Sequence, residues 1–527
     1  MKVKRFFKKL FSRFTLVGLT IILMFLFSVA LVGSAIVVAL LLFDHYLPDY
    51  TVYLYYGLVA LSWLIEVIAV LNVVNRDMLP ESKLPWILCI VALNALGVAI
   101  YVVFSHNRPT RFQHKRYRLI SERANPFLAR SLSKEYLEET LKTRADVSEA
   151  LTLSTPAAVA YRNTKTQYFP SGERFFDSFL SDLERAEKYV FLEFFIIAKG
   201  EMWSRILDVL RRKVSEGVEV RVMYDDIGSM SRVHVRYYNT LRKMGIKCVK
   251  FNPFVPVVTN VHNFRDHRKI AVIDGKVAYT GGLNLADEYI NKVHLYGHWK
   301  DSAIRLEGEG VKSFILLFMG MYDLQAKKEE DFTKYIPEYN EFEDEGIVQV
   351  YGSGPRPIYE RQVAEDVYLN ILGGAKKYVY ITTPYLIIDY RMREALCLAA
   401  QRGVDVRIVT PKIPDKKIVF ALTRSNYMAL IKAGVKIYEY TPGFIHAKNF
   451  LCDGDVGVVG TVNLDYRSFV HHYEDAVLMF KTKALEDIKK DFDELFEISE
   501  LQTKESAKRN VIFRWILEIA KVFAPLF

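Results

Sequence analysis

One polar motif occurs twice in this chain with the same internal spacing, and no other sequence feature constrains the fold as strongly. The second copy lies 179 residues after the first. Two matching copies indicate a duplicated structural unit, because chance does not reproduce four polar positions together with their intervals. The repeated residues are His267, Lys269, Asp274 and Asn284 in the first copy and His446, Lys448, Asp453 and Asn463 in the second.

The residues around the motif repeat as well. Gly217–Arg221 matches Gly403–Arg407, and a helical pattern leads into an apolar run at Tyr189–Ile197 and again at Tyr378–Thr382. Helices that alternate with strands predict an α/β fold in which helices cover both faces of a sheet. Within each motif an Asp-Gly pair separates two strand patterns, which predicts a tight hairpin turn.

The motif side chains suit chemistry at phosphorus. His267 and Lys269 lie two residues apart on a predicted strand, as do His446 and Lys448, so each pair presents both side chains on one face. Two lysines can neutralise a phosphodiester. One neutral histidine can then attack phosphorus while the other, protonated, supplies a proton to the leaving oxygen. The sequence therefore predicts a pseudo-twofold phosphate site that works through a phosphohistidine intermediate.

The remaining motif residues have supporting roles in this hypothesis. Asn284 and Asn463 lie on the far side of each hairpin and can donate hydrogen bonds to the substrate. Asp274 and Asp453 belong to the catalytic motif but occupy the turns. We expect these two aspartates to anchor the hairpins through hydrogen bonds and charge pairing.

Each imidazole also needs a partner on its second ring nitrogen. Aligning residues 301–306 with residues 474–479 nominates Asp301 and Glu474 as the orienting acids. The alternative is that either acid is an ordinary surface residue. No zinc-type spacing connects the cysteines with each other or with nearby histidines, so we predict neither a metal nor a cofactor. The cysteines are Cys89, Cys248, Cys397 and Cys452.

Three apolar segments near the start of the chain, Leu16–Phe43, Tyr53–Val74 and Pro85–Phe104, are each long enough to span a bilayer. The basic start resembles a signal peptide, but the first segment is too long for a cleaved one and predicts a retained anchor. Whether two or three segments span stays open. Glu66 lies within the second segment and is either a functional group or a residue near the interface.

The positive charge is concentrated beside these segments. Residues 1–124 contain 14 lysines and arginines against 6 acidic residues, a net charge of +8 out of +10 for the chain. This favours anionic lipid headgroups over nucleic acid as the partner, or a plain topology signal. The segment Val511–Phe527 places Trp515 and several aliphatic residues on one face, which predicts either an interfacial helix or a helix docked on the protein core.

The doubled motif resembles the two HxK(x4)D(x6)G-[GS]-x-N motifs of the phospholipase D superfamily, over roughly Leu151–Glu500. Two apolar segments, joined by a short proline-bearing turn ahead of the repeat, make the resemblance closest to bacterial cardiolipin synthases. Further matching strings are Glu193–Phe195, Asn284–Tyr289, Ser353–Pro355, Thr383–Tyr385, Asn463–Phe469 and Ala524–Leu526. One departure is the pair His471-His472, which stands where the family pattern is more apolar; these histidines either tune headgroup choice or are simply exposed.

The resemblance implies an α/β fold of two pseudo-twofold-related α-β-α sandwich domains, preceded by N-terminal transmembrane helices, in the bacterial cytoplasmic membrane as a multi-pass protein. It implies transfer of a phosphatidyl group between two phosphatidylglycerols to give cardiolipin and glycerol, with His267 as the nucleophile. The expected parts are a membrane anchor at 1–110, a basic helical linker at 111–150, two catalytic domains at 151–330 and 347–500, a bridge at 331–346 and an amphipathic helix at 505–527.

The same residues also allow other functions. A hydrolytic phospholipase D, or another phosphatidyltransferase of the superfamily, differs only in the acceptor and is weakly separated by sequence. A nuclease is disfavoured, because residues 125–527 carry 57 basic against 55 acidic residues, whereas binding to a phosphate backbone usually needs a basic face. A lipid-binding scaffold with a dead site is disfavoured by the intact histidines of both motifs.

Overall fold

The computed structural model describes residues 41–42, 45, 48–105, 114–118, 122, 132–155, 158–254, 263–342, 346–508 and 510–523. The chain divides into two compact units. Residues 1–107 and 254–262 belong mainly to one unit, and residues 108–253 and 263–525 form the other. The doubled motif lies entirely in the second unit.

The described part of the first unit is a helical hairpin, α3 (Pro48–Asn75) and α4 (Pro80–Phe104). Both helices are long and apolar enough to cross a membrane, as predicted for the second and third apolar segments. The hydroxyl of Tyr101 donates to Asn72 Oδ1 at 2.7 Å and joins the helices. Glu66 accepts a hydrogen bond from Ser62 one turn earlier. The predicted first segment, apart from residues 41 and 42, lies outside the described residues.

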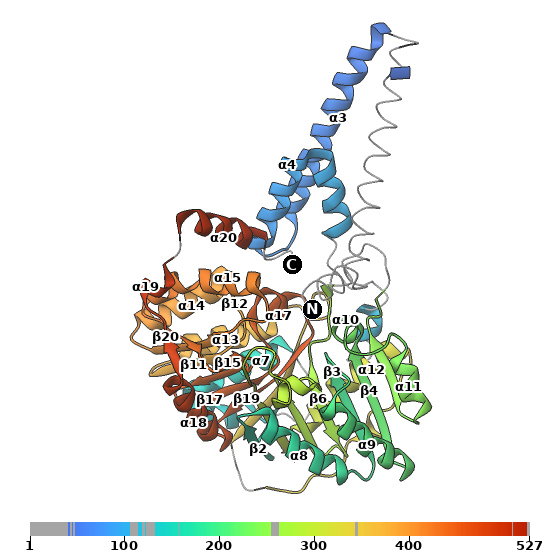
Figure 1. The fold of residues 1–527 in the computed structure, drawn as a ribbon, viewed down its shortest axis with the longest axis vertical. Coiled ribbons are helices and arrows are strands. Elements are labelled where there is room, and N and C mark those ends of the chain that lie inside the picture. The colour runs from blue at the N-terminus through green and yellow to red at the C-terminus, as the bar shows by residue number, and fades with distance from the viewer. Residues whose placement is uncertain are drawn as a thin grey trace, which may run out of the picture. The chain divides into compact units, whose positions relative to one another are not determined.

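The first catalytic half is built on a seven-stranded sheet with the order β2-β9-β7-β6-β3-β4-β5 (Figure 1). Strands β3, β4 and β5 are parallel to one another, whereas β6, β7, β9 and β2 continue the sheet in antiparallel pairs. The strand bounds are β2 (Thr164–Phe169), β3 (Tyr189–Phe194), β4 (Glu219–Asp225), β5 (Lys247–Phe251), β6 (Lys269–Ile273), β7 (Val277–Gly281) and β9 (Ala303–Gly308).

The second half repeats this topology strand for strand. Its nine-stranded sheet has the order β1-β10-β19-β17-β16-β11-β13-β14-β20, and the middle seven strands correspond to those of the first sheet. The short strands β1 and β20 extend its two edges. The bounds are β1 (Ala160–Tyr161), β10 (Ile347–Ser353), β11 (Tyr378–Thr382), β13 (Asp405–Pro411), β14 (Lys436–Tyr440), β16 (Asn449–Cys452), β17 (Val456–Gly460), β19 (Glu474–Phe480) and β20 (Ser499–Leu501).

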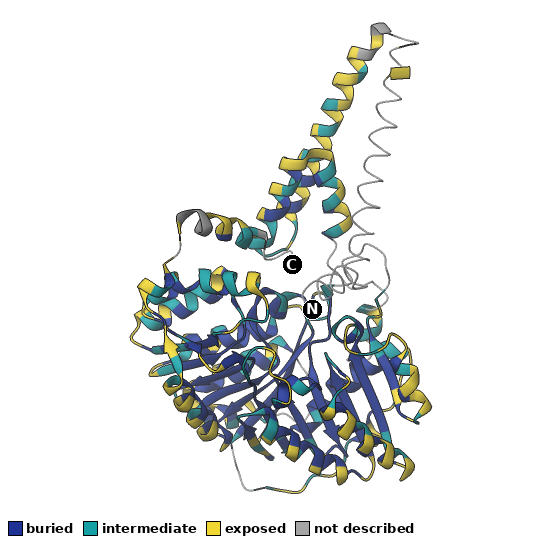
Figure 2. Cartoon of the chain, in the orientation of Figure 1, coloured by how far each residue is buried: buried dark blue, intermediate teal, exposed yellow. Residues whose placement is uncertain are grey.

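Helices cover both faces of each sheet, and the strands are largely buried (Figure 2). In the first half α8 and α9 enclose one apolar core, while α12 covers the opposite face and contributes to a core shared with the second half. The helix bounds of the first half are α8 (Gly172–Glu184), α9 (Glu201–Ser215), α10 (Asp226–Ser229), α11 (Tyr237–Lys243), η3 (Asp287–Ile290) and α12 (Val311–Ala326).

The second half uses a similar set of helices, with α13 and α14 near one face and α18 on the other. Their bounds are α13 (Val363–Gly374), α14 (Tyr390–Gln401), α15 (Lys417–Ser425), α16 (Tyr427–Ala433), α17 (Tyr466–Val470), α18 (Ala484–Glu497), α19 (Lys504–Ala507) and α20 (Val511–Phe523). This arrangement confirms the α/β fold predicted from the alternation of helices and strands.

Two connecting segments are more closely integrated than a linker or bridge suggests. The predicted basic linker contains α6 (Lys134–Leu141), η1 (Lys142–Arg144) and the start of α7 (Ala145–Ser154), and it adds Leu137, Leu141 and other apolar side chains to the shared core. Strand β1 then pairs with β10 of the second sheet, although it precedes the whole first repeat. The bridge contains η4 (Thr333–Tyr335), whose Tyr335 is buried beside Arg221.

The C-terminal helix α20 contacts α15, and only one of its described side chains, Leu517, is buried. Trp515, Ile516 and Ile519 are 66%, 56% and 62% exposed. One side of the helix therefore packs on the protein while another presents apolar side chains outward. The interfacial role of this helix stays a prediction.

Candidate active site

The two motifs meet across the pseudo-twofold axis through paired backbone segments. Strand β8 (His298–Lys300) of the first half runs parallel to β15 (Gly443–Ile445) of the second half. Asp266 forms the corresponding parallel bridge with Tyr473. As a result the residue before each acid accepts a hydrogen bond from the backbone of the motif histidine in the other half. These bonds are His446 N to Lys300 O at 2.7 Å and His267 N to Tyr473 O at 2.9 Å.

This backbone pairing between the two halves corrects one detail of the sequence prediction. The histidine-lysine pairs were expected within strands, but β6 begins at Lys269 and β16 begins at Asn449. His267 and His446 therefore precede the regular strands. The reason is that their backbone pairs with the opposite half rather than with the neighbouring strand of their own hairpin. Each histidine remains next to its lysine, because Lys269 Nζ donates to His267 O at 2.6 Å, and Lys448 contacts His446 in the same way.

Each motif histidine is held by an acid from the other half. His267 Nδ1 lies 3.0 and 2.9 Å from the two carboxylate oxygens of Glu474, and His446 Nδ1 lies 2.7 Å from Asp301 Oδ2. Both acids are fully buried. A carboxylate accepts hydrogen bonds, so Nδ1 of each ring carries the proton and Nε2 is left as the reactive nitrogen. The structure thus brings all four of these predicted residues together.

The two lysines are almost completely buried in the same site. Burial lowers the pKa of Lys269 to about 8, although Glu474 and nearby acids raise it in part. Burial lowers the pKa of Lys448 to about 7, with Asp301 acting in the opposite direction and Lys269 in the same one. Lysines that lie close together in a dry site favour an anion between them, since the anion restores their charge.

The surroundings of the two histidines favour neutral imidazoles. Burial, followed by the charges of Lys269 and Lys448, lowers the pKa of His267 well below its ordinary value. Burial and Lys448 lower the pKa of His446 to about 4, against the opposing effect of Asp301. An incoming phosphate would shift both values upward, because an opposite charge favours the protonated form. The site can therefore gain a proton when its anionic ligand binds.

The motif aspartates anchor the hairpins away from the histidines. Asp274 accepts hydrogen bonds from the backbone N–H groups of residues 187, 188 and 189 at 2.7–2.8 Å. Asp453 accepts the equivalent three from residues 376, 377 and 378 and forms an ion pair with Arg144 at 2.6 Å. Both aspartates have a positive φ, as the following glycines do, which is the backbone geometry of a tight Asp-Gly hairpin turn.

The two asparagines are placed differently from one another. Asn284 Oδ1 accepts from Ile196 N at 2.9 Å, and its Nδ2 donates to the Tyr289 hydroxyl at 2.7 Å, so it fixes the loop after β3. Among the described residues, Asn463 Nδ2 makes only a 3.3 Å contact with Asp465, and its buried Oδ1 has no hydrogen-bond partner. Asn463 is therefore the better placed of the two to meet a ligand.

Three site residues were not predicted from the sequence in these roles. Two of them are rings that lie two residues before the orienting acids Asp301 and Glu474, and each ring flanks the motif histidine of the other half. The ring centroids of Trp299 and His446 are 5.3 Å apart, and those of His472 and His267 are 5.5 Å apart. His472 Nδ1 lies 3.6 Å from Glu474, and its Nε2 accepts from Arg467 Nε at 3.2 Å. The alignment that paired Asp301 with Glu474 also places Trp299 and His472 at equivalent positions, and this equivalence could have identified the two rings. The reading of His471 and His472 as exposed residues is wrong.

One group of side chains could in principle share a cation. The ligand atoms of His267, His472 and Glu474 all lie within 4.8 Å of one another. Lys269 and Lys448 act on the same site electrostatically, and their positive charge opposes a divalent ion there. The donor set fits an anion better than a resident metal.

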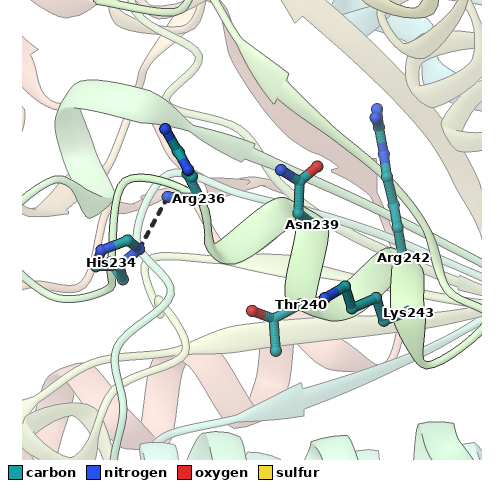
Figure 3. Close-up of a pocket in the computed structure, with 6 residues that line it drawn as sticks. All are labelled: His234, Arg236, Asn239, Thr240, Arg242 and Lys243. Carbon is teal, nitrogen blue, oxygen red and sulfur yellow. Dashed lines mark hydrogen bonds between the residues drawn. The ribbon is translucent and has the colours of Figure 1, made fainter.

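A separate surface hollow of about 610 Å³ lies beside α11. His234, Arg236 and Asn239 line it together with three neighbouring residues (Figure 3). His234 Nδ1 accepts from the Arg236 backbone, which is the interaction drawn in the figure. None of the motif residues lines this hollow, so we locate the candidate site by the doubled motif.

Comparison with known proteins gives a consistent family. The domain family described as "Cardiolipin synthase, PLD-like domain" matches residues 179–294 and 368–496. An uncharacterized protein of Streptococcus mutans is 43% identical over 87% of this chain and 99% of its own length. A cardiolipin synthase of Geobacillus sp. (strain WCH70) is 31% identical over 87% of this chain and 91% of its own length.

Solved structures support the fold. The phosphatidylserine synthase of Haemophilus influenzae superposes with a TM-score of 0.53 and 14% sequence identity, covering 72% of this chain and 97% of that one. Together with the matched PLD-like domain family, this likeness confirms the phospholipase D-type architecture that the resemblance implied. The two apolar helices and the lipid-synthesising relatives indicate association with a phospholipid membrane. With its doubled motif, its duplicated sheet and these relatives, the chain belongs to the family of cardiolipin synthases with phospholipase D-like domains.

Proposed function

We propose that this protein joins two phosphatidylglycerol molecules into cardiolipin and releases glycerol, acting as a phosphatidyltransferase. The observation that carries the proposal is the arrangement in which each motif histidine is held by an acid from the other half. Two buried lysines and two acid-held histidines converge from the two halves, and this set matches one phosphodiester with a nucleophile on one side and a proton donor on the other.

In the first step Nε2 of His267 attacks the phosphorus of the donor lipid. The bond between phosphorus and the glycerol headgroup oxygen breaks, and His446 gives its proton to that oxygen. Glu474 keeps the proton of His267 on Nδ1 and stabilises the positive charge that develops on the ring. Lys269 and Lys448 neutralise the non-bridging oxygens. The products are glycerol and a phosphatidyl group bound to His267.

In the second step the acceptor is the free hydroxyl of a second phosphatidylglycerol. His446, now neutral, removes the proton from this hydroxyl as its oxygen attacks phosphorus. The bond between phosphorus and His267 Nε2 breaks, and cardiolipin leaves. Asp301 supports His446 in both steps, since the hydrogen bond at 2.7 Å favours the protonated ring. Each histidine returns to its starting state without an additional reactant.

The membrane part of the proposal rests on α3 and α4. Both helices have the length and composition of membrane spans, and the charge of the chain is concentrated around them. We infer a multi-pass protein of the bacterial cytoplasmic membrane whose anchor keeps the catalytic halves at the lipid surface.

The test uses the purified full-length protein with phosphatidylglycerol as the only lipid. Mass spectrometry should find cardiolipin and free glycerol in equal amounts. A protein with His267→Ala and His446→Ala together serves as the matched blank. Formation of phosphatidic acid in place of cardiolipin would show a hydrolytic phospholipase, and the proposal would then be wrong.

A further inference from the structure

Arg467 is a partly buried cation whose charge is not balanced by a carboxylate contact. It lies on α17, four residues after Asn463. Its Nε donates to His472 Nε2 at 3.2 Å, and its terminal nitrogens make no hydrogen bond or ion pair with the residues that the structure describes. Burial lowers the pKa of Arg467, Asp465 raises it without contact, and Arg265 lowers it further.

Other buried arginines of the catalytic unit are paired with acids. Arg221 contacts Glu219 and Glu330 at 2.6 and 2.7 Å, and Arg265 contacts Asp225 at 3.2 Å. This is the ordinary arrangement, since an unpaired buried charge is costly. Arg467 departs from it, so an anion that is absent from the protein itself is the natural partner of this guanidinium.

The pseudo-twofold axis makes the departure clearer. The position equivalent to Arg467 in the first half is Glu288, which is paired with Arg232 at 2.9 Å. The first half therefore contains a closed ion pair where the second half has an open guanidinium. The two positions correspond in the repeat, with Glu288 on the 3-10 helix η3 and Arg467 on the α-helix α17.

The location of Arg467 relates it to the nucleophile. A single imidazole, His472, lies between them: it accepts from Arg467 on Nε2, and its ring centroid is 5.5 Å from that of His267. The backbone N–H groups of residues 471 and 472 both donate to Arg467 O at 2.9 Å and fix the turn that presents this pair. The guanidinium is thus separated by one ring from the imidazole of His267, the nucleophile of the proposed mechanism.

The proposed reaction needs a second anion site at this range. The acceptor lipid has a phosphodiester of its own, and in the product a three-carbon glycerol bridge separates the two phosphates. Lys269 and Lys448 are committed to the donor phosphate in that mechanism. An arginine is suited to bind the phosphate of the acceptor lipid, because a guanidinium binds two oxygens of one phosphate.

We propose that Arg467, positioned by His472, binds the phosphate of the acceptor lipid and so makes an anionic glycerophospholipid the preferred acceptor. This inference rests on the proposed function and deepens it. Acceptors without a phosphate, such as glycerol or water, would not use Arg467. The donor half of the reaction would not need it either.

The test separates the two acceptors. Deuterated glycerol is added to phosphatidylglycerol micelles, and the exchange of glycerol into phosphatidylglycerol is followed together with cardiolipin formation. For Arg467→Gln we expect cardiolipin formation to fall roughly ten- to a hundredfold, the loss typical of one charge-assisted hydrogen bond, with glycerol exchange within about twofold of the unmodified protein. Arg467→Lys should recover part of the loss. Arg391→Gln, on α14 and ion-paired with Glu365 and Asp366, is the matched control.

The outcomes are distinguishable. Equal losses of exchange and of cardiolipin in Arg467→Gln would make Arg467 a structural residue and overturn the inference, as would no loss of either. Glycerol exchange reports a folded site, so a misfolded variant cannot imitate the expected result. If the unmodified protein exchanges glycerol but forms no cardiolipin, the proposed function itself fails, and the inference fails with it.

Discussion

The segments that carry the two catalytic histidines have the same backbone role but different surroundings. In the first half the neighbours of His267 are charged and buried: Arg265, Asp266 and Arg268 are 2%, 0% and 1% exposed. In the second half the same positions around His446 are apolar and equally buried, at 1%, 0% and 0%; these residues are Phe444, Ile445 and Ala447.

The charged residues of the first half form a connected network. Arg268 donates to the carbonyl of Glu474 at 3.3 Å and to the Tyr359 hydroxyl at 2.9 Å, and it lies 3.9 Å from buried Glu193. Burial raises the pKa of Glu193 well above its ordinary value and, together with Asp225, raises that of Asp266 to about 6. The network thus holds the backbone of the acid that orients His267.

Duplication gave both halves the same backbone arrangement around the motif histidine. Different residues stabilise that arrangement in each half: charged ones around His267 and apolar ones around His446. Arg268 fixes the first segment through directional hydrogen bonds to the Glu474 carbonyl and the Tyr359 hydroxyl, whereas the apolar segment around His446 relies on packing. We infer that the stricter support belongs to the histidine that forms the covalent bond. The predictions below test whether the two halves differ in the way that this inference requires.

The largest expected effect comes from removing either histidine. His267→Ala and His446→Ala should each lower cardiolipin formation by roughly 10⁴- to 10⁶-fold, as for other catalytic residues that act as a unit. They should fail differently, because only His267 forms the bond to phosphorus. Trapping with labelled phosphatidylglycerol should find lipid phosphate on the His446→Ala protein and none on His267→Ala. Label on His446 in the second protein would reverse the comparison between the halves.

A smaller effect is expected in stability. Arg268→Ala removes the buried hydrogen bonds to the Glu474 carbonyl and the Tyr359 hydroxyl and should cost about 1.5–3 kcal/mol of unfolding free energy, as loss of a hydrogen bond from a charged group does. The equivalent change in the second half, Ala447→Gly, should cost only about 0.4–1 kcal/mol, because glycine gives the unfolded chain more conformational freedom. Thermal unfolding of the two variants in detergent measures the difference. Equal melting temperatures would mean that the charged network does not support the first half.

The smallest effect concerns charge in the shared site. The lowered pKa values of Lys448, about 7, and Lys269, about 8, mean that both charges are present at pH 6 and lost as pH rises through these values. Glycerophosphoglycerol, a soluble diester whose own charge is constant in this range, should bind roughly tenfold or more weakly at pH 9 than at pH 6. Titration calorimetry gives the two dissociation constants.

A variant sharpens this measurement. In Lys448→Arg the guanidinium keeps its charge at pH 9, so the part of the alkaline weakening that comes from Lys448 should disappear, and the part that comes from Lys269 should remain. An affinity that does not change between pH 6 and pH 9 in the unmodified protein would show that the lysines remain protonated throughout. Lys269 and Lys448, one from each half, would then both contribute a positive charge to phosphate binding at every pH in this range.

Much of the site could be predicted from the chain because it follows local patterns. The Asp-Gly turns at Asp274 and Asp453 are decided by two adjacent residues with a preferred backbone geometry. The alternation of helices and strands is likewise local. Alignment of the two repeats was sufficient to nominate Asp301 and Glu474, since a duplicated unit repeats its supporting residues as well as its motif.

Other features could not be read from the chain, because they depend on contacts distant in sequence. No local pattern shows that Glu474 serves His267 and Asp301 serves His446. Arg467 and His472 gain meaning only when the second half is laid against the first. The placement of β1 at the edge of the second sheet is of the same kind.

The sequence by itself therefore determined the duplication, the chemistry of the paired motifs and the class of fold, since each is set by residue type and spacing. Only the tertiary structure decided which acid holds which histidine, how deeply the lysines are buried, and which arginine is left without an acid. The physical reason is that burial and partner choice come from packing between the halves, and these interactions set the pKa values on which the proposed reaction depends.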